Sequence, residues 1–205
     1  MGYTVSMSMF ERARNLVSWA PPEVGSVAHL ISLTADEGTW VKLEDFHQHL
    51  NVVFVVFESL TDPSVDQWLK EWNRRIGQFE SLETVVFGIH SARTDDLRSY
   101  RQQLGLEFFL LYDPLAIESR ALRCSSRLAP VCKTTVVIVG KDGRILFSER
   151  GQTDPSRALE VISGKEGREA AQLKAESETQ AGGPATGLGT GPAPVQNVDS
   201  DKAEA

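Results

Sequence analysis

The sequence predicts a layered α/β domain built on a mixed sheet, and the arrangement of its apolar residues leads to this fold class. Residues 51–57 and 134–139 are apolar runs rich in β-branched side chains, which is the composition of strands buried on both faces of a sheet. Segments with helical periodicity separate such runs, so strands and helices alternate along the chain. This alternation predicts parallel crossovers early in the chain, and a turn motif at residues 141–144 predicts a late antiparallel hairpin.

The first 23 residues stand apart from this alternation. Five apolar residues recur there at roughly helical spacing: Met9, Phe10, Ala13, Leu16 and Val17. The pattern stops at Pro21-Pro22, so we expect an appended helix or a flexible arm. The domain itself begins with a strand around residues 30–33, a turn at residues 36–39 and a short extended return over residues 40–43.

A helix follows the first buried strand. Thr61, Asp62 and Pro63 supply a capping oxygen and a proline at the first helical position, where its missing N–H costs nothing. Apolar side chains then recur at helical spacing and predict one helix with a single apolar stripe: Val65, Trp68, Leu69, Trp72, Ile76 and Phe79. The remaining elements are expected in this order: a strand over 84–89, a helix over 95–104, a strand within 106–112, a helix over 114–122, the strand at 134–139, its return at 145–148, and a last helix from Asp154 or Pro155 through Ile162.

The chain changes composition after residue 163. Every aromatic residue lies at or before Phe147, and residues 164–205 are polar at first and then rich in Gly, Pro and Ala. A segment without aromatics rarely buries enough apolar surface to offset the entropy of ordering it. The sequence therefore predicts an N-terminal helix or arm over residues 1–23, one domain over residues 24–163, and a disordered acidic tail over residues 164–205.

Composition argues against several classes of protein. The chain of 205 residues carries 21 Lys and Arg against 28 Asp and Glu, so we expect neither a nucleic-acid nor a membrane partner. No apolar run approaches the roughly 18 residues of a membrane span. The N-terminus also lacks the long apolar region of a secretory signal. With only two cysteines and no disulfide framework, the expected location is the cytoplasm.

Several short strings occur in an order that points to one family. They are Leu33…Gly38…Val41-x-Leu43, the buried run at 52–57, Leu104-Gly105-Leu106-x-Phe108…Asp113-Pro114, and Asp142-Gly143-Arg144-Ile145. Together they resemble the AhpC/TSA branch of the peroxiredoxins over residues 24–162. The resemblance implies a thioredoxin-like fold of three layers, α/β/α, around a central mixed sheet. It also implies a homodimer, because many relatives dimerise.

The same resemblance locates a missing cysteine. Peroxiredoxin chemistry depends on a Pro-x-x-x-Thr-x-x-Cys string, whose thiolate attacks the peroxide. Here Thr61 keeps the threonine, but Phe57 replaces the proline and Ser64 replaces the peroxidatic cysteine. A serine hydroxyl is essentially un-ionised at neutral pH, so Ser64 cannot take over as that nucleophile. The family's arginine falls at Lys133 or Thr134, depending on a register choice of one residue.

Two interpretations of this helix start remain open. In the first, Thr61 and Ser64 are simply part of a capped helix start, and this is the interpretation we favour. In the second, the helix end retains a vestigial pocket that binds a small anion or polar ligand, because backbone N–H groups at a helix N-terminus attract negative charge.

The two cysteines are the remaining redox candidates. The resemblance implies that Cys132 lies near Ser64, and we expect the charges of Lys133 and Arg127 to lower the pKa of its thiol. Cys124, on the same connection, would then act as the resolving thiol. The alternative is a pair of small, partly buried apolar residues without chemistry.

Two functions therefore stay open. The first is a non-peroxidatic family member with a binding or regulatory role toward a protein partner, and the replacement at Ser64 favours it. The second is an antioxidant thiol oxidoreductase that uses Cys132, with or without Cys124, and a thiol reductant. Neither requires a cofactor. His47 and His49 suggest a metal site, but residues two apart on a helix point in different directions, so we expect surface histidines and no metal.

Overall fold

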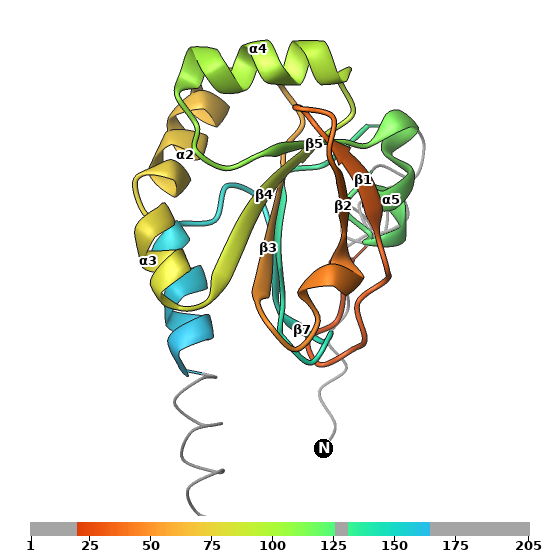
Figure 1. The fold of residues 1–205 in the computed structure, drawn as a ribbon, viewed down its shortest axis with the longest axis vertical. Coiled ribbons are helices and arrows are strands. Elements are labelled where there is room, and N and C mark those ends of the chain that lie inside the picture. The colour runs from red at the N-terminus through yellow and green to blue at the C-terminus, as the bar shows by residue number, and fades with distance from the viewer. Residues whose placement is uncertain (1–19, 126–130, 165–205) are drawn as a thin grey trace, which may run out of the picture. The chain divides into compact units, whose positions relative to one another are not determined.

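The structure is a computed structural model that describes residues 20–125 and 131–164 (Figure 1). Most of the predicted N-terminal helix or arm at residues 1–23 lies outside the described residues, and so does nearly all of the predicted tail at residues 164–205. The boundaries of the three predicted parts therefore stay predictions. Within the described ranges, no helix is both long enough and apolar enough to cross a membrane.

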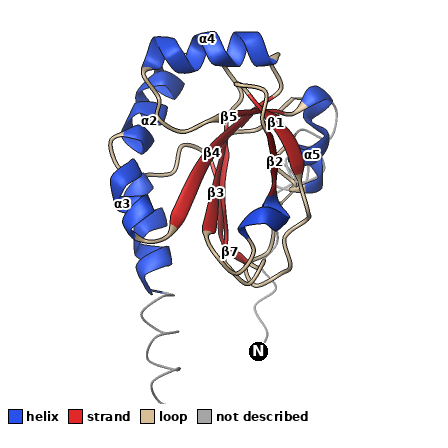
Figure 2. Cartoon of the chain, in the orientation of Figure 1, coloured by secondary structure: helices blue, strands red, loops and turns tan. Residues whose placement is uncertain are grey.

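A seven-stranded mixed sheet forms the centre of the fold, in the strand order β2-β1-β5-β4-β3-β6-β7 (Figure 2). Its strands are β1 Ser32–Ala35, β2 Trp40–Lys42, β3 Asn51–Val56, β4 Thr84–His90, β5 Leu110–Tyr112, β6 Thr135–Val139 and β7 Ile145–Arg150. Strands β3, β4 and β5 run parallel, whereas β6 runs antiparallel to both β3 and β7. The early crossovers and the late hairpin are thus confirmed.

Helices cover both faces of this sheet. They are α2 Pro63–Asn73, α3 Ile76–Ser81, α4 Thr94–Leu104, α5 Ile117–Ala121, a helix over residues 155–164, and the 3-10 helices η1 Leu43–Phe46 and η2 Pro114–Ala116. Helices α2, α3, α4 and 155–164 share one apolar cluster with one face of the sheet, and η2 and the residues flanking α5 pack into a second cluster on the other face. Figure 1 shows α2, α3 and α4 on one side of the strands and α5 on the other. The predicted three-layer α/β/α fold is confirmed.

Strand β3 shows why its sequence is apolar from Val52 to Val56. Val53 and Val55 belong to the cluster beneath α2, whereas Val52, Phe54 and Val56 belong to the cluster on the opposite face. All five side chains are at most 1% exposed. A strand with one solvent-exposed face would alternate polar and apolar residues. The continuous apolar run of β3 therefore reflects burial by a helical layer on each face of the sheet.

The predicted single helix over residues 63–79 is wrong in one respect, because a turn at Arg74 and Arg75 divides it into α2 and α3. In one straight helix, residues seven apart lie about 10 Å apart along the axis. Here the rings of Trp72 and Phe79 stack with centroids 5.3 Å apart. The turn allows this contact, and the N–H of Arg75 donates to the carbonyl of Trp72 within it. Apolar spacing continues across the break, so the periodicity did not reveal it.

Gly88 in β4 provides a test of this packing. A Cβ atom at this position would lie 2.4 Å from Cδ2 of Leu110 and 3.2 Å from Cε1 of Phe57, both buried. We expect Gly88→Ala to lower the free energy of unfolding by about 1–3 kcal/mol, because overpacking forces neighbours off their rotamers. Urea denaturation measures the change, and Gly77→Ala in α3 is the matched control because nothing lies within 4 Å of its Cβ position. Equal midpoints for Gly88→Ala and the unsubstituted chain would contradict the packing described here.

Candidate functional site

The predicted site residues converge on one edge of the sheet. The parallel strands β3, β4 and β5 end there, and Glu58 and Asp113 lie in the loops that follow β3 and β5. His90 is the last residue of β4, and the antiparallel strand β6 begins there shortly after Cys132 and Lys133. In open α/β sheets, ligands bind outside the carboxyl ends of the strands. This edge is therefore the candidate functional site.

Ser64 lies in the first turn of α2, where both its backbone and its side chain are engaged. Asp62 caps the helix, and its Oδ1 accepts a 2.8 Å hydrogen bond from the Ser64 N–H. This bond lowers the pKa of the Asp62 carboxyl, so Asp62 is negatively charged at neutral pH. The Ser64 Oγ accepts a 3.0 Å hydrogen bond from Nε2 of Gln152. At Thr61, the backbone N–H donates to Oγ of Ser59 over 3.1 Å. Both the hydroxyl and the N–H of Ser64 are thus hydrogen-bonded to side chains of the protein itself, those of Gln152 and Asp62.

The side chain of Lys133 forms an ion pair just beyond the end of β3. Its Nζ forms a 2.8 Å ion pair with Oε2 of Glu58, and both side chains are partly exposed. Its backbone N–H donates to the carbonyl of Cys124 over 2.8 Å, while the carbonyl of Thr134 accepts from Gly151. Glu58 is a site residue that the sequence analysis missed. Only its position directly after a buried strand signalled it, because its partner lies far away in the chain.

The structure places Cys132 and the helix that carries Ser64 against opposite faces of the sheet. Cys132 is 1% exposed and packs in the apolar cluster on the α5 face, whereas α2 packs against the opposite face. Its Sγ lies 3.4 Å from Oγ of Ser119, and either atom can donate. Burial raises the pKa of the Cys132 thiol to about 11, although the hydrogen bond with Ser119 acts in the opposite direction. The expectation of a lowered pKa is wrong, because loss of water around the sulfur is the largest effect on this thiol, and the Lys133 ammonium pairs with Glu58 instead.

Cys124 lies in a similar environment. It is fully buried, its Sγ donates a 3.2 Å hydrogen bond to the carbonyl of Leu122, and burial raises the pKa of its thiol to about 12. Both cysteines are free thiols. Arg127, the other residue expected to activate Cys132, lies outside the described residues. Protonated, buried thiols are the state of structural rather than reactive cysteines. The redox roles of Cys132 and Cys124 themselves stay predictions.

His90 at the end of β4 adds a neutral group to the site. Its ring stacks on Phe57 with centroids 5.0 Å apart, and its Nδ1 accepts a 2.9 Å hydrogen bond from the N–H of Ala92. Burial lowers the pKa of His90, while a hydrogen bond to the Glu58 backbone acts in the opposite direction. An imidazole of this kind is uncharged at neutral pH. It therefore supplies no positive charge to stabilise a thiolate or another anion.

His47 and His49 follow η1, at the opposite edge of the sheet from the candidate site. Both side chains are exposed, as expected for surface histidines. Across the residues that the structure describes, no three His, Cys, Asp or Glu side chains gather closely enough to hold a metal ion.

The strand order, the two helical layers and the helix α2 that follows the central strand β3 define a thioredoxin-like α/β protein. Residues 24–148, more than half of the chain, match the AhpC/TSA family, and the chain belongs to that family. The resemblance inferred from the sequence motifs is therefore confirmed.

Solved peroxiredoxin structures share the fold. Peroxidoxin BcpB from Mycobacterium tuberculosis has a TM-score of 0.64 and 14% identity, covering 69% of this chain and 97% of its own. A cysteine-to-serine mutant of PrxQ from Xylella fastidiosa has a TM-score of 0.61 and 20% identity, covering 77% of this chain and 99% of its own. AhpC from Mycobacterium tuberculosis has a TM-score of 0.65 and 15% identity, covering 72% of this chain and 94% of its own. Among curated protein sequences, none is similar enough to count as a match.

Proposed function

We propose that this chain is a non-peroxidatic member of its family, in which Ser64 stands at the position of the peroxidatic cysteine and the fold serves a binding or regulatory role. The occupied first turn of α2 carries this proposal. There, the Ser64 hydroxyl accepts from Gln152 and its N–H donates to Asp62. A peroxidatic thiolate and its peroxide need the hydrogen-bonding groups of this first turn. Here the side chains of Asp62 and Gln152 bond to the N–H and the hydroxyl of Ser64 instead.

The charges around α2 support the same proposal. Asp62 and Asp66 flank Ser64, and like charges raise the free energy of an anion placed between them. The Tyr100 hydroxyl donates to the Asp66 carboxylate, and burial together with this contact raises the pKa of Tyr100. Glu58 neutralises Lys133 in their ion pair. The local field therefore disfavours the thiolate on which peroxide reduction depends.

The alternative function, an antioxidant thiol oxidoreductase based on Cys132 and Cys124, has less support. Its nucleophile would have to be a thiolate, and burial raises the pKa of both thiols to about 11 and about 12. A protein partner and a homodimer go with the binding role, a thiol reductant goes with the oxidoreductase, and the cytoplasm is the proposed location of both.

A hydroperoxide assay separates the two functions. We expect the chain, supplied with dithiothreitol and hydrogen peroxide at neutral pH, to consume peroxide no faster than dithiothreitol alone, because it presents no thiolate. Cys132→Ser and Cys124→Ser should leave this rate unchanged. A rate above the blank that disappears in Cys132→Ser, but not in Cys124→Ser or Ser64→Ala, would instead establish the oxidoreductase and overturn the proposal.

A further inference from the structure

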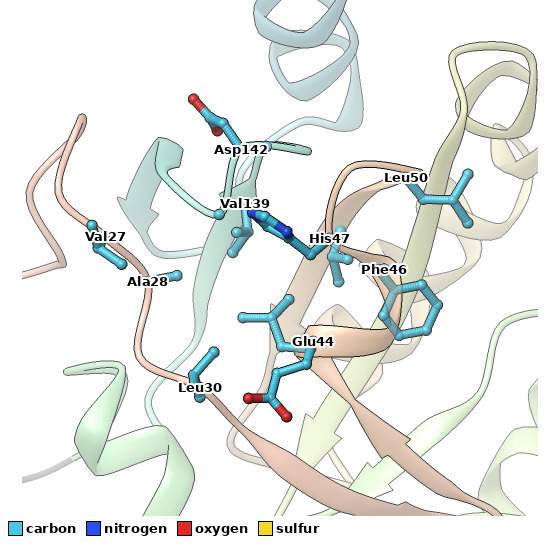
Figure 3. A pocket seen from close by; sticks show the side chains of 13 residues that line it. Val27, Ala28, Leu30, Glu44, Phe46, His47, Leu50, Val139 and Asp142 are labelled. Carbon is cyan, nitrogen blue, oxygen red and sulfur yellow. The ribbon is translucent and has the colours of Figure 1, made fainter.

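A groove opens at the edge of the sheet opposite the candidate site, with a volume of about 310 Å³ (Figure 3). One wall is the segment that leads into β1, and the other is η1 with the loop after it. Figure 3 shows Val27, Ala28 and Leu30 on one side of the opening, and Phe46 and Leu50 on the other. The lining is mainly apolar, and Val52 of β3 and Val139 of β6 complete it. Its volume lies at the lower end of the range for pockets that take ligands or anchoring side chains.

Two features make this groove a candidate docking site. Val27 is 70% exposed and Leu30 is 58% exposed, so the rim presents large apolar side chains to water. Large apolar side chains exposed at the rim of a groove are typical of docking sites. The groove is also acidic, because Glu44 and Asp142 line it and neither Lys nor Arg does. Figure 3 shows Glu44 and Asp142 on opposite sides of the opening. The cover should therefore be an apolar segment that carries positive charge.

We propose that residues 9–17 of this same chain dock in the groove through their apolar stripe. The segment consists of residues before Ala20, where the described chain begins, and the wall residues Val27 and Ala28 follow shortly after. A short tether of this kind gives the segment an effective concentration in the millimolar range, so even a weak contact is populated.

The sequence of the segment matches the groove in both apolarity and charge. At helical spacing its apolar residues form one stripe: Met9, Phe10, Ala13, Leu16 and Val17. On a helical projection, Arg12 and Arg14 lie about 100° to either side of the centre of this stripe. When the stripe faces the groove, the two arginines point toward the rims that carry Glu44 and Asp142. Residues 1–19 hold these two arginines and one acid, Glu11, within a chain whose net charge is -7.

A single engineered thiol on the rim tests the proposal in the full chain. Leu30→Cys places a thiol at an exposed position, and the native Cys124 and Cys132 are buried. The measurement is the rate of iodoacetamide labelling of that thiol, followed by mass spectrometry. Phe10→Asp with Leu16→Asp puts two charges on the apolar stripe. Ser8→Asp with Asn15→Asp is the matched control, since it adds the same charges on the opposite face.

We expect the stripe variant to label at least about fivefold faster than the Leu30→Cys chain alone, because labelling measures the fraction of molecules in which the groove is open. The control variant should label as the Leu30→Cys chain does, at both low and tenfold higher protein concentration. Equal rates in all three chains would overturn the proposal. If the labelling rate of the Leu30→Cys thiol rises on dilution in all three chains, the groove is covered by a second copy instead. If the rate is equally slow in all three chains at both concentrations, compared with free cysteine, another ligand covers the groove.

Discussion

The native thiols should react with iodoacetamide at neutral pH about 300-fold more slowly than free cysteine, or slower still. The reason is that the thiolate is the reactive species, and burial raises the pKa of the Cys132 thiol to about 11. A free cysteine has a pKa near 8.5, so the thiolate fraction of Cys132 is lower by about 2.5 powers of ten. Restricted access to the buried sulfur slows the reaction further. Differential alkylation followed by peptide mass spectrometry measures the rate of each thiol.

The pH dependence of this reaction distinguishes a buried thiol from an activated one. The labelling rate of Cys132 should climb about tenfold per pH unit and reach no plateau below pH about 11, where its pKa lies. A plateau near pH 7 would contradict the buried, protonated thiol.

The same raised pKa links folding to pH. The folded state keeps the proton more tightly than the unfolded chain does. The protonated Cys132 thiol therefore makes its full contribution to the free energy of unfolding below pH about 8.5, the pKa of the unfolded chain. This contribution is lost as the pH rises toward about 11, the pKa of the folded state. Cys132→Ser should accordingly flatten the fall in urea midpoint across this range.

Asp36→Ala should lower the free energy of unfolding by about 1–3 kcal/mol, because it removes a buried carboxylate that pairs with the partly exposed Arg101 and accepts from a buried N–H. The Asp36 side chain is 0% exposed, and its Oδ2 lies 3.3 Å from Nη1 of Arg101. Its Oδ1 accepts a 3.1 Å hydrogen bond from the N–H of Leu110, which ties the β1–β2 turn to β5. Alanine would leave that buried N–H without its partner. Urea denaturation of the purified chain measures the effect.

Two further variants locate the source of that loss. Asp36→Asn keeps an acceptor for Leu110 and removes the charge, so it should cost less than Asp36→Ala. Glu37→Ala, at the exposed neighbouring position, should change stability by no more than about 0.5 kcal/mol, as surface substitutions usually do. If Asp36→Ala behaves like Glu37→Ala, the ion pair has no structural role.

Local sequence patterns predicted those parts of the fold that local patterns control. The apolar runs of β3 and β6 identified the central strands, and the proline after Asp62 identified the start of α2. Other elements depend on distant contacts. The predicted helix over residues 114–122 is split into η2 and α5, because Leu115 and Ala116 take left-handed backbone conformations with φ of 58° and 51°. No residue type at these two positions signals such a conformation.

The site was harder to predict than the fold, for a physical reason. Sequence neighbours suggested that Lys133 would activate Cys132, but adjacent residues of an extended segment point to opposite sides. Lys133 accordingly pairs with Glu58 at the surface, while Cys132 enters the core. Gln152, which donates to Ser64, follows the last strand, β7. Its role in the site could be recognised only when the position of β7 in the sheet was known. Burial and long-range pairing, rather than spacing, decide the chemistry of these side chains.

The pairing of β3 with β6 has a consequence for synthesis of the chain. β3 ends at Val56, yet the strand that hydrogen-bonds along one of its edges starts only at Thr135. At a ribosomal rate of about 5–20 residues per second, the intervening stretch of about 80 residues takes several seconds to emerge. Throughout that time β3 presents an unpaired, valine-rich edge to every other nascent chain nearby. Chaperone cover during translation is therefore most needed while residues 57–134 are being made.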